Sequence, residues 1–289
     1  MIVVLTALQL EYTAIRKHLV GIQVHRHSAG TRFETGRVAG RHVAIAVIGE
    51  GNMSAAAITE RAITEFGSHT VLFVGIAGAL VDWLRLGDVV VGTRTYGYHS
   101  GRSTDTAFRT RPRAWPSSHE LEQVARSVDV ADKWRSTLVT RPRVYFAPIA
   151  AGEVLLDSRT SPVAAHLRDH YEDAVAVEME SAGMASAGQL NNALTLTVRG
   201  ISDFAAGAKD RTGRPRAAAE HAAAFAAAVI AQLDDTDPPH ETSRPEPDSG
   251  IAVHNEANNS NGVIQIGFVR GNVEFGSESA SLRDGEGGS

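Results

Sequence analysis

Short apolar runs alternate with segments of helical period along most of the chain. The run IVVLTA at 2–7 precedes LEYTAIRKHL at 10–19, whose apolar residues return at helical spacing. An apolar run of about four to eight residues is typical of a buried strand, and the longer period is typical of an amphipathic helix. A chain that repeats this pair buries its strands in a sheet covered by helices. We therefore expect an α/β domain with a largely buried sheet.

The same alternation continues to residue 233. Further strand-like runs are predicted at 42–49, 70–78, 88–96, 144–151, 174–179 and 193–201. Helical spacing is found at 53–66, 161–171 and 180–190, and an Ala-rich helix is expected to end near Leu233. We assign residues 1–234 to one folded domain.

The composition changes after Leu233. The stretch DDTDPPHETSRPEPDSG places four prolines among acids and small polar residues, which predicts a disordered linker over 235–259. Residues 260–276 contain VIQIG, where aliphatic residues alternate with glutamine and glycine, a pattern typical of a stacking cross-β segment. A plain β-hairpin docked on the domain is the alternative. Residues 277–289 are a polar tail that we expect to be disordered.

Composition excludes several classes of function. The absence of cysteine rules out disulfides, iron–sulfur ligation and thiolate catalysis. A formal net charge of −5 gives no general attraction to nucleic acid or to an anionic membrane, and we expect neither as a partner. The opening run MIVVLTAL is too short for a secretory signal, and no stretch approaches the roughly 20 apolar residues that span a bilayer. We expect the protein in the cytoplasm.

The glycine and histidine motifs favour structural interpretations. GEGNMS at 49–54 follows a strand and opens a helix, but Ser54 replaces the third glycine of a dinucleotide fingerprint, so a tight turn is preferred. His166 and His170 stand one helical turn apart, yet Leu167 occupies the place of the glutamate in a zinc-protease helix. We expect no metal and no cofactor.

Acidic residues follow several of the predicted strands. Glu11 comes after the first run, Glu178 and Glu180 follow AVAV, and Asp203 follows LTLTVRGIS, which also carries Arg199. Ligands of open α/β sheets bind beyond the carboxyl ends of the strands, so these side chains are expected to converge there. Each acid alone has the alternative of an N-cap or surface role. The set predicts a polar ligand site.

These residues belong to stretches that resemble a known family. TALQLEY, VGIAGAL with LGDVVV, PIAAGEVLL, AVAVEMES and VRGISDF occur in order along residues 1–233. In this pattern the chain resembles the nucleoside phosphorylase and nucleosidase superfamily, most closely the methylthioadenosine/S-adenosylhomocysteine nucleosidases. The resemblance implies a three-layer α/β/α sandwich with a central mixed sheet, a small purine nucleoside or nucleotide as ligand, and a homo-oligomer that is at least a dimer.

The resemblance also implies roles for individual residues. Glu180 would hold the ribose 2′ and 3′ hydroxyls, since a carboxylate can accept hydrogen bonds from both, and Met179 would pack against the sugar. Glu178 would lie beside them. Asp203 would protonate or hydrogen-bond N7 of the purine, and Glu11 would activate the attacking water.

Further site residues follow from the same resemblance. Arg199 would lie near the attacking water, and Ala77, Gly78, Leu155 and Ser202 would join the substrate-binding residues. Cleavage through an oxocarbenium-like sugar would be stabilised by negative charge around the ribose.

The predicted reaction is hydrolysis of the N-glycosidic bond of an adenine-type purine nucleoside or nucleotide, with release of the free base. A phosphorylase would need cationic groups where phosphate attacks, whereas Glu11 would repel an anion. Phosphate-dependent cleavage stays open as an alternative. A non-catalytic nucleotide sensor that controls polymerisation of the tail is a second alternative.

The segment RSTDTAFRTRPRAW at 102–115 bears on the 5′ substituent. Arg102, Arg109, Arg111 and Arg113 accompany one acid, Asp105. In the family that the chain resembles, this segment lies near the 5′ side of the substrate, so the arginines suggest a nucleotide such as ATP. A solvated basic loop explains them equally well.

The segment at 260–276 resembles the RIP homotypic interaction motif and its bacterial amyloid-signalling counterparts, through the aliphatic, Gln, aliphatic, Gly order at 264–267. Together, the parts suggest an effector of a bacterial defence or signalling system. A partner carrying a matching amyloid-type motif would recruit it through this segment.

Overall fold

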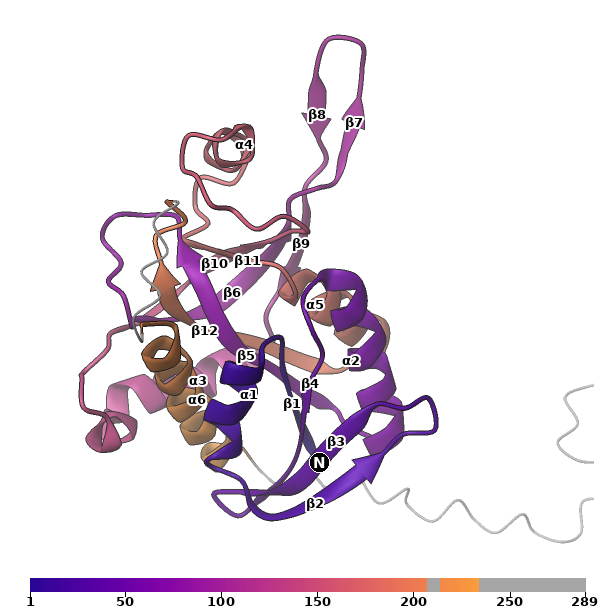
Figure 1. The fold of residues 1–289 in the computed structure, drawn as a ribbon, viewed down its shortest axis with the longest axis vertical. Coiled ribbons are helices and arrows are strands. Elements are labelled where there is room, and N and C mark those ends of the chain that lie inside the picture. Colours follow the sequence, from indigo (N-terminus) through magenta and orange to yellow (C-terminus); the bar gives the residue numbers. More distant parts are fainter. Residues whose placement is uncertain (207–213, 234–289) are drawn as a thin grey trace, which may run out of the picture. The chain divides into compact units, whose positions relative to one another are not determined.

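One mixed β-sheet between two layers of helices forms the domain in this computed structural model, which describes residues 1–206 and 214–233 (Figure 1). The strands are β1 (Ile2–Thr6), β2 (Val20–Arg26), β3 (Arg32–Val38), β4 (Arg41–Val47), β5 (Thr70–Ala79), β6 (Val89–Gly97), β7 (Gly101–Ser103), β8 (Phe108–Thr110), β9 (Arg113–Pro116), β10 (Val144–Ala151), β11 (Ala176–Glu178) and β12 (Leu194–Asp203). The helices are α1 (Gln9–Arg16), α2 (Asn52–Phe66), α3 (His119–Ala131), the 3₁₀ helix η1 (Lys133–Thr137), α4 (Pro162–His170), α5 (Ser181–Leu190) and α6 (Arg214–Gln232). The predicted α/β fold with a central mixed sheet is confirmed.

The sheet combines parallel and antiparallel pairs in the order β11-β10-β6-β12-β5-β1-β4-β3-β2. β1 runs parallel to β4 and β5, and β12 runs parallel to β5 but antiparallel to β6. β11 additionally pairs with the end of β5, through Ala176 opposite Ala79 and Val177 opposite Gly78. This pairing closes five strands into a ring, which brings the end of β11 against the carboxyl end of β5.

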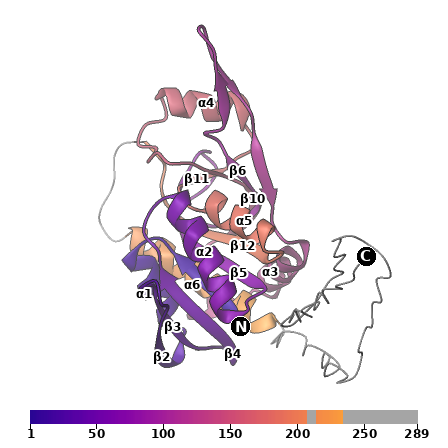
Figure 2. The ribbon, with the colours of Figure 1, turned by 90° about the vertical axis from the view of Figure 1, so that its right-hand side faces the viewer.

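Helices cover both faces of the sheet, as the family resemblance implies for a three-layer sandwich. Figure 1 shows α1 and α6 on one side, and Figure 2 looks onto the other side, where α2 and α5 pack together. β1 alternates between the two cores: Ile2 and Val4 pack in the core with α1, α3 and α6, whereas Val3 and Leu5 pack in the core with α2. Burying each such side chain stabilises the fold by about 1.5–3 kcal/mol.

The alanines of α6 let that helix lie directly on β12. A Cβ atom at Gly200 of β12 would overlap the Ala218 carbonyl of α6, so the two backbones are in contact. Ala222, Ala223 and Ala226 are fully buried at this interface. None of the helices within 1–206 and 214–233 combines the length and the hydropathy that a membrane crossing requires.

Several elements were not predicted from the sequence. β2 has no buried residue, so it shows no apolar run, and it is held instead by its antiparallel ladder with β3. α3 was also not predicted, although its Leu121, Ala125 and Val128 are buried. The strands β7 and β8 form a separate two-stranded hairpin that projects from the domain (Figure 1). The predicted linker, cross-β segment and polar tail at 235–289 lie outside the described residues.

Candidate active site

A cavity of about 610 Å³ lies at the carboxyl ends of β1, β5, β11 and β12. It is lined by Ala7, Leu8, Leu10, Glu11, Glu50, Ile76, Ala77, Gly78, Leu155, Val177, Glu178, Met179, Glu180, Ser202, Asp203, Pro215 and Arg216. Every predicted site residue except Arg199 is in this lining. The structure therefore brings the acids from distant parts of the sequence to one cavity, as the strand-end argument expected.

Glu11 is held in the first turn of α1 by backbone groups. Its Oε2 accepts hydrogen bonds from the N–H groups of Ala7 at 2.8 Å and Leu8 at 2.9 Å, and its Oε1 accepts one from Ile76 at 2.8 Å. The side chain is almost completely buried. Burial raises the pKa of the Glu11 carboxyl above its ordinary value of 4.5, and the Arg199 guanidinium and the three N–H groups oppose that rise. A carboxylate in this state is a stronger base than one in water.

Glu178 has its carboxylate occupied by protein donors. Its Oε2 accepts from the backbone N–H of Glu180 and from the N–H and hydroxyl of Ser181, and it forms an ion pair with Arg199. Its Oε1 also accepts from the Ser181 N–H, at 3.1 Å. The carboxylate therefore satisfies the first N–H groups of α5. Although it borders the cavity, Glu178 has little remaining capacity to accept hydrogen bonds from a ligand.

Glu180 is far less engaged than Glu178. Its Oε1 accepts from the Gly51 N–H at 3.2 Å, and its Oε2 lies 3.5 Å from Arg199 Nη2. Burial raises the pKa of Glu180 to about 8, with the charge of Glu178 adding to the effect and that of Arg199 opposing it. This carboxyl group keeps lone pairs that face the cavity, so it can accept hydrogen bonds from a ligand.

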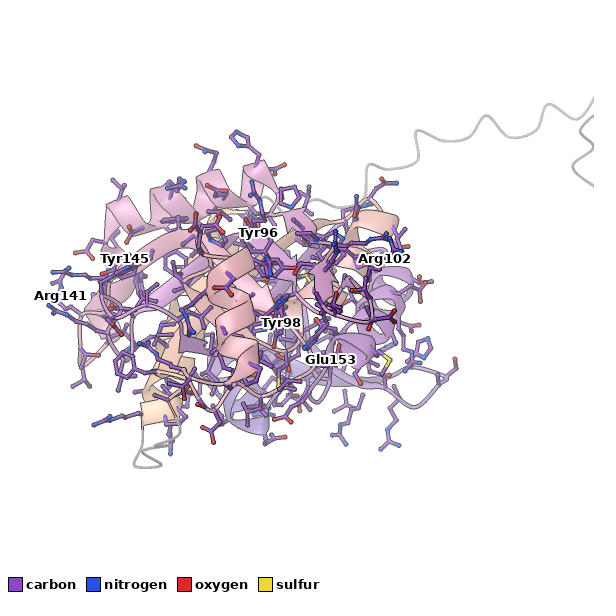
Figure 3. All side chains as sticks on the ribbon, turned by 90° about the horizontal axis from the view of Figure 1, so that it is seen from above. Tyr96, Tyr98, Arg102, Arg141, Tyr145 and Glu153 are labelled. Carbon is purple, nitrogen blue, oxygen red and sulfur yellow. The ribbon has the colours of Figure 1, made fainter. Side chains whose placement is uncertain are left out.

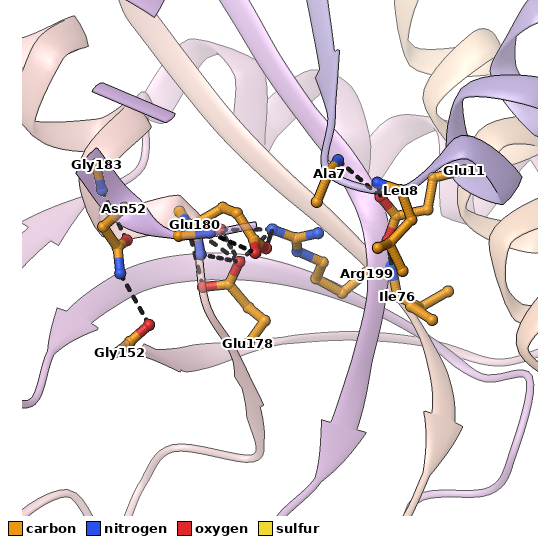
Figure 4. A network of polar contacts seen from close by, with 12 residues as sticks. Ala7, Leu8, Glu11, Asn52, Ile76, Gly152, Glu178, Glu180, Gly183 and Arg199 are labelled. Atoms are coloured by element: carbon orange, nitrogen blue, oxygen red, sulfur yellow. Dashed lines mark hydrogen bonds and ion pairs between the residues drawn. The ribbon is translucent and has the colours of Figure 1, made fainter. Parts of the chain in front are cut away.

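Arg199 lies between the two groups of acids (Figure 4). Its side chain is fully buried, with Nη2 directed at Glu178 and the guanidinium carbon 4.5 Å from the Phe73 ring centroid. Its Nε and Nη1 have no hydrogen-bond partner among the described residues. A Cβ atom at Gly75 would lie 2.5 Å from Glu11 Oε1 and overlap Arg199 Nη1. Glycine at this position thus lets the Glu11 carboxylate and the Arg199 guanidinium approach each other.

Asp203 ends β12 and is fixed by its own neighbours. Its Oδ2 accepts from the Ser202 hydroxyl at 2.8 Å, and its Oδ1 accepts from the Ala205 N–H at 2.8 Å. A Cβ atom at Gly78 would lie 3.0 Å from Oδ1, so glycine there leaves room beside the carboxylate. Ala77 and Gly78 border the cavity next to this carboxyl group, which suits a flat, partly polar ligand.

The turn at 49–54 positions Glu180. Gly49 and Gly51 have φ values of 81° and 103°, which L side chains rarely adopt, and α2 begins at Asn52. The Asn52 side chain accepts from the Gly183 N–H at 2.9 Å and donates to the Gly152 carbonyl at 3.0 Å (Figure 4). This stretch is the tight strand-to-helix turn that the sequence favoured. Its amide contact to Glu180 was not foreseen, because local sequence does not show which distant strand faces a turn.

Two charged residues of the cavity were also missed, Glu50 and Arg216. Conversely, none of the arginines singled out at 102–113 lines the cavity of this chain. They lie on and beside the β7–β8 hairpin, and Figure 3 shows Arg102 on the opposite side of the domain from Arg141. The expectation that these arginines lie at the 5′ side of the substrate is therefore not met within one chain.

The histidine pair has a structural explanation. His166 Nε2 lies 3.1 Å from the Tyr98 carbonyl, and the rings of His166 and His170 are 5.0 Å apart. Within residues 1–206 and 214–233, no group of three or more His, Cys, Asp and Glu side chains is arranged to hold a metal ion.

Comparison with known proteins agrees with the fold of the domain. The sequence profile described as the Phosphorylase superfamily matches residues 1–233. A 5′-methylthioadenosine/S-adenosylhomocysteine nucleosidase of Mycobacterium tuberculosis is 26% identical over 220 residues, covering 70% of this chain and 85% of the relative. The crystal structure of the corresponding Neisseria meningitidis enzyme in complex with methylthio-immucillin-A superposes with a TM-score of 0.70 at 25% identity, covering 80% of this chain and 99% of that one.

A second kind of relative is larger. The ATP nucleosidase Cap17 of Escherichia coli is 27% identical over 264 residues, which covers 81% of this chain and 50% of the relative. This chain thus spans about half the length of that protein.

Proposed function

Because the chain belongs to the Phosphorylase superfamily, we propose that it hydrolyses the N-glycosidic bond of an adenine-type purine nucleoside or nucleotide and releases the free base. The observation that carries this proposal is the convergence of Glu11, Glu180 and Asp203 on one cavity. The relatives named as nucleosidases of methylthioadenosine, S-adenosylhomocysteine and ATP support the choice of an adenine-type base.

The sugar would be held by Glu180. Its lone pairs face the cavity, whereas those of Glu178 are taken by Ser181 and Arg199. A vicinal diol presents two donors, and their hydrogen bonds to the carboxylate form of Glu180 would favour that form against the rise in pKa that burial causes. Glu178 would instead act as a positioning residue that fixes Arg199 and the start of α5. Met179 would supply apolar contact to the sugar.

The base would leave with the help of Asp203. A proton passed from the Asp203 carboxyl group to N7 of the purine lets N9 take the electron pair of the breaking C1′–N9 bond, so the base departs neutral. General acid catalysis of this kind contributes roughly two to four powers of ten to the rate. The hydroxyl of Ser202, 2.8 Å from Oδ2, would keep the carboxyl oriented.

Water would be the nucleophile, with Glu11 as the base. The oxygen of water forms the new bond to C1′, and its proton passes to Glu11, whose pKa is raised by burial. Arg199 lies outside the cavity lining, so it would act on the water through Glu11, whose charge it faces, and the negative charge of the acids would stabilise the cationic sugar of the transition state. Glu11 at this point disfavours phosphate, because two anions would repel each other there.

Base release provides the test. The purified chain would be incubated with adenosine, methylthioadenosine, AMP and ATP, with and without phosphate, and free base measured by chromatography. We expect release without phosphate from at least one substrate, and the preferred substrate identifies the 5′ group. Release that requires phosphate would make the protein a phosphorylase. Intact nucleosides and nucleotides throughout would contradict catalysis and leave a binding module.

We further propose that the protein acts as an effector of a bacterial defence or signalling system, recruited through residues 260–276. The support is the aliphatic, Gln, aliphatic, Gly order of that segment, which lies outside the described residues. Deleting 260–276 should abolish recruitment by a partner with a matching motif while base release persists. Unaltered recruitment would contradict this role.

Two accompanying proposals rest on the family and on composition. We propose that the chain forms at least a dimer. We also propose that it works in the cytoplasm, because a chain without cysteine is compatible with a reducing compartment. Light scattering of the purified chain checks the first proposal and cell fractionation the second. A monomer at working concentration would contradict the proposed dimer. A periplasmic or extracellular location would contradict the proposed place in the cytoplasm.

A further inference from the structure

A second, separate cavity of about 250 Å³ lies on the far side of the start of α6. Its walls are the loop Arg85–Asp88 before β6, the loop Thr140–Arg143 before β10, and Arg214, Ala217 and His221 of α6. The neighbouring Pro215 and Arg216 line the candidate active site instead. The two cavities thus share the first turns of α6 but have no lining residue in common.

The charge of this lining is strongly positive. It contains the arginines at positions 85, 141, 143 and 214, and among the described lining residues Asp88 is the one acid. The Asp88 carboxylate is already used within the protein, because Oδ2 accepts from the Arg85 N–H at 2.9 Å and Oδ1 from the Arg143 N–H at 3.0 Å. These donors are backbone N–H groups, and Asp88 forms no ion pair with the guanidinium groups of Arg85 and Arg143.

Two of these guanidinium groups have no partner among the described residues. Arg85 and Arg143 have exposed side chains that form no hydrogen bond or ion pair with the described residues. Arg141 differs, since it forms an ion pair with Asp132. A guanidinium presents several N–H donors in a planar fork that matches phosphate oxygens, so two of them at one cavity suit a phosphate group.

The walls that carry these arginines are held by hydrogen bonds that are partly buried. His221 Nδ1 donates to the Gly87 carbonyl at 2.7 Å, which leaves Nε2 to accept from the Thr140 hydroxyl at 2.8 Å. Arg135 Nε donates to the Pro142 carbonyl at 2.7 Å, and the Val89 N–H donates to the Arg143 carbonyl at 2.9 Å. The backbone on both sides of the cavity is thus held in place before any ligand arrives, which reduces the cost of binding.

From the unpaired arginines and the fixed walls we infer that this cavity binds a phosphate group, either as inorganic phosphate or as the phosphate of a sugar phosphate. Pockets for drug-sized ligands usually measure about 300–1,000 Å³. This cavity, at about 250 Å³, is smaller, so a whole nucleotide is too large for it. The site lies outside the candidate active site, and the inference does not depend on the proposed reaction.

The loop of this cavity is also connected to the catalytic strand. The Gly87 N–H donates to the Ile201 carbonyl at 2.8 Å, and the Ile201 N–H donates to the Asp88 carbonyl at 2.8 Å. Ile201 is two residues before Asp203. A phosphate bound between Arg85 and Arg143 would therefore contact a loop that is hydrogen-bonded to α6 through His221 and to β12 through Ile201.

Calorimetric titration with inorganic phosphate and, separately, with ribose 5-phosphate tests the site, with chloride holding the ionic strength constant. The key variant is the double substitution Arg85→Gln and Arg143→Gln, with each single substitution measured beside it. Arg216→Gln, on the active-site side of α6, reports binding in the other cavity. The double substitution Arg109→Gln and Arg111→Gln, on the hairpin, controls for the loss of two positive charges.

We expect saturable binding of at least one of the two ligands to the unmodified chain. The Arg85 and Arg143 double variant should weaken it by roughly tenfold or more, because it removes the charge-assisted hydrogen bonds of both guanidinium groups, and a tenfold loss corresponds to about 1.4 kcal/mol. Arg216→Gln and the hairpin control should leave affinity unchanged. A stronger response to phosphate than to ribose 5-phosphate, or the reverse, identifies the source of the phosphate group.

Three results would overturn the inference. Binding lost in Arg216→Gln but kept in the Arg85 and Arg143 variant would place the ligand in the substrate cavity. Equal weakening in both double variants would indicate a general charge effect. Absence of saturable binding of either ligand at millimolar concentration would mean that there is no such site. Unfolding temperatures of all variants, measured without ligand, verify that the exposed substitutions leave the fold intact.

Discussion

Replacing Glu180 by glutamine changes how the stability of the protein depends on pH. Burial raises the pKa of Glu180 in the folded chain to about 8, whereas its ordinary value is 4.5. The unfolded chain therefore loses this proton at lower pH than the folded chain does. Below the unfolded pKa both states are protonated, and the group's contribution to stability is fully present. That contribution declines as the pH rises and is lost once the pH passes the folded pKa.

The magnitude follows from the two pKa values. One pKa unit corresponds to about 1.36 kcal/mol, so the full difference between 4.5 and about 8 corresponds to roughly 5 kcal/mol. Roughly 4 kcal/mol of this stability is lost between about pH 5 and about pH 9, a range in which unfolding can be measured. Glutamine does not titrate and can still accept the Gly51 N–H. The free energy of unfolding of the Glu180→Gln protein, relative to that of the unmodified protein, should therefore increase by roughly this amount as the pH rises.

Urea denaturation of both proteins at several pH values measures the difference directly. Glu60→Gln, at an exposed position of α2, is the matched control and should show no comparable dependence on pH. Base release by Glu180→Gln should fall strongly, since the ribose loses its carboxylate. A stability difference that stays constant with pH, or that grows in the opposite direction, would refute the argument that burial raises the pKa of Glu180.

Three further predictions concern the same site. Asp203→Asn should lower base release by roughly two to four powers of ten while the unfolding temperature stays near that of the unmodified protein. The control Asp105→Asn, on the hairpin, should change neither quantity. A nearly unmodified rate in Asp203→Asn would exclude Asp203 as the proton donor. Because burial raises the pKa of Glu11, the acidic limb of the pH–rate profile should lie above 4.5. This limb should disappear in the residual activity of Glu11→Gln. A limb that survives the substitution would belong to another group. In Gly183→Ala, the new Cβ would overlap the Asn52 carbonyl, so a cost of about 1–3 kcal/mol in urea denaturation should outweigh the roughly 1 kcal/mol gain in helix propensity; a stabilised variant would contradict this packing.

The sequence determined much of the architecture because strand and helix signals are local. The apolar runs that became β1 and β5 show their burial directly, since strands covered on both faces consist largely of consecutive apolar residues. β2 carried no such signal, because none of its residues is buried. It exists through pairing with β3, a contact that no local pattern records.

The site followed the same division. Acids placed after strands were expected to meet, because the carboxyl ends of neighbouring strands lie at one edge of the sheet, and Glu11 and Asp203 do line one cavity. The strand-end argument by itself did not distinguish Glu178 from Glu180, and only the family resemblance assigned the ribose to Glu180. The tertiary structure separates them: Arg199 and Ser181 occupy the first, while the second keeps lone pairs toward the cavity.

Charge gave the least guidance from sequence alone. The arginines at 102–113 form the densest basic stretch that the sequence analysis singled out, yet none of them lines either cavity. Arg85, Arg143 and Arg216 are scattered along the chain and drew no attention, but the fold brings them to the two cavities that share the start of α6. Electrostatic attraction depends on distance in space, and the folded chain, not residue order, decides which charges are near one another.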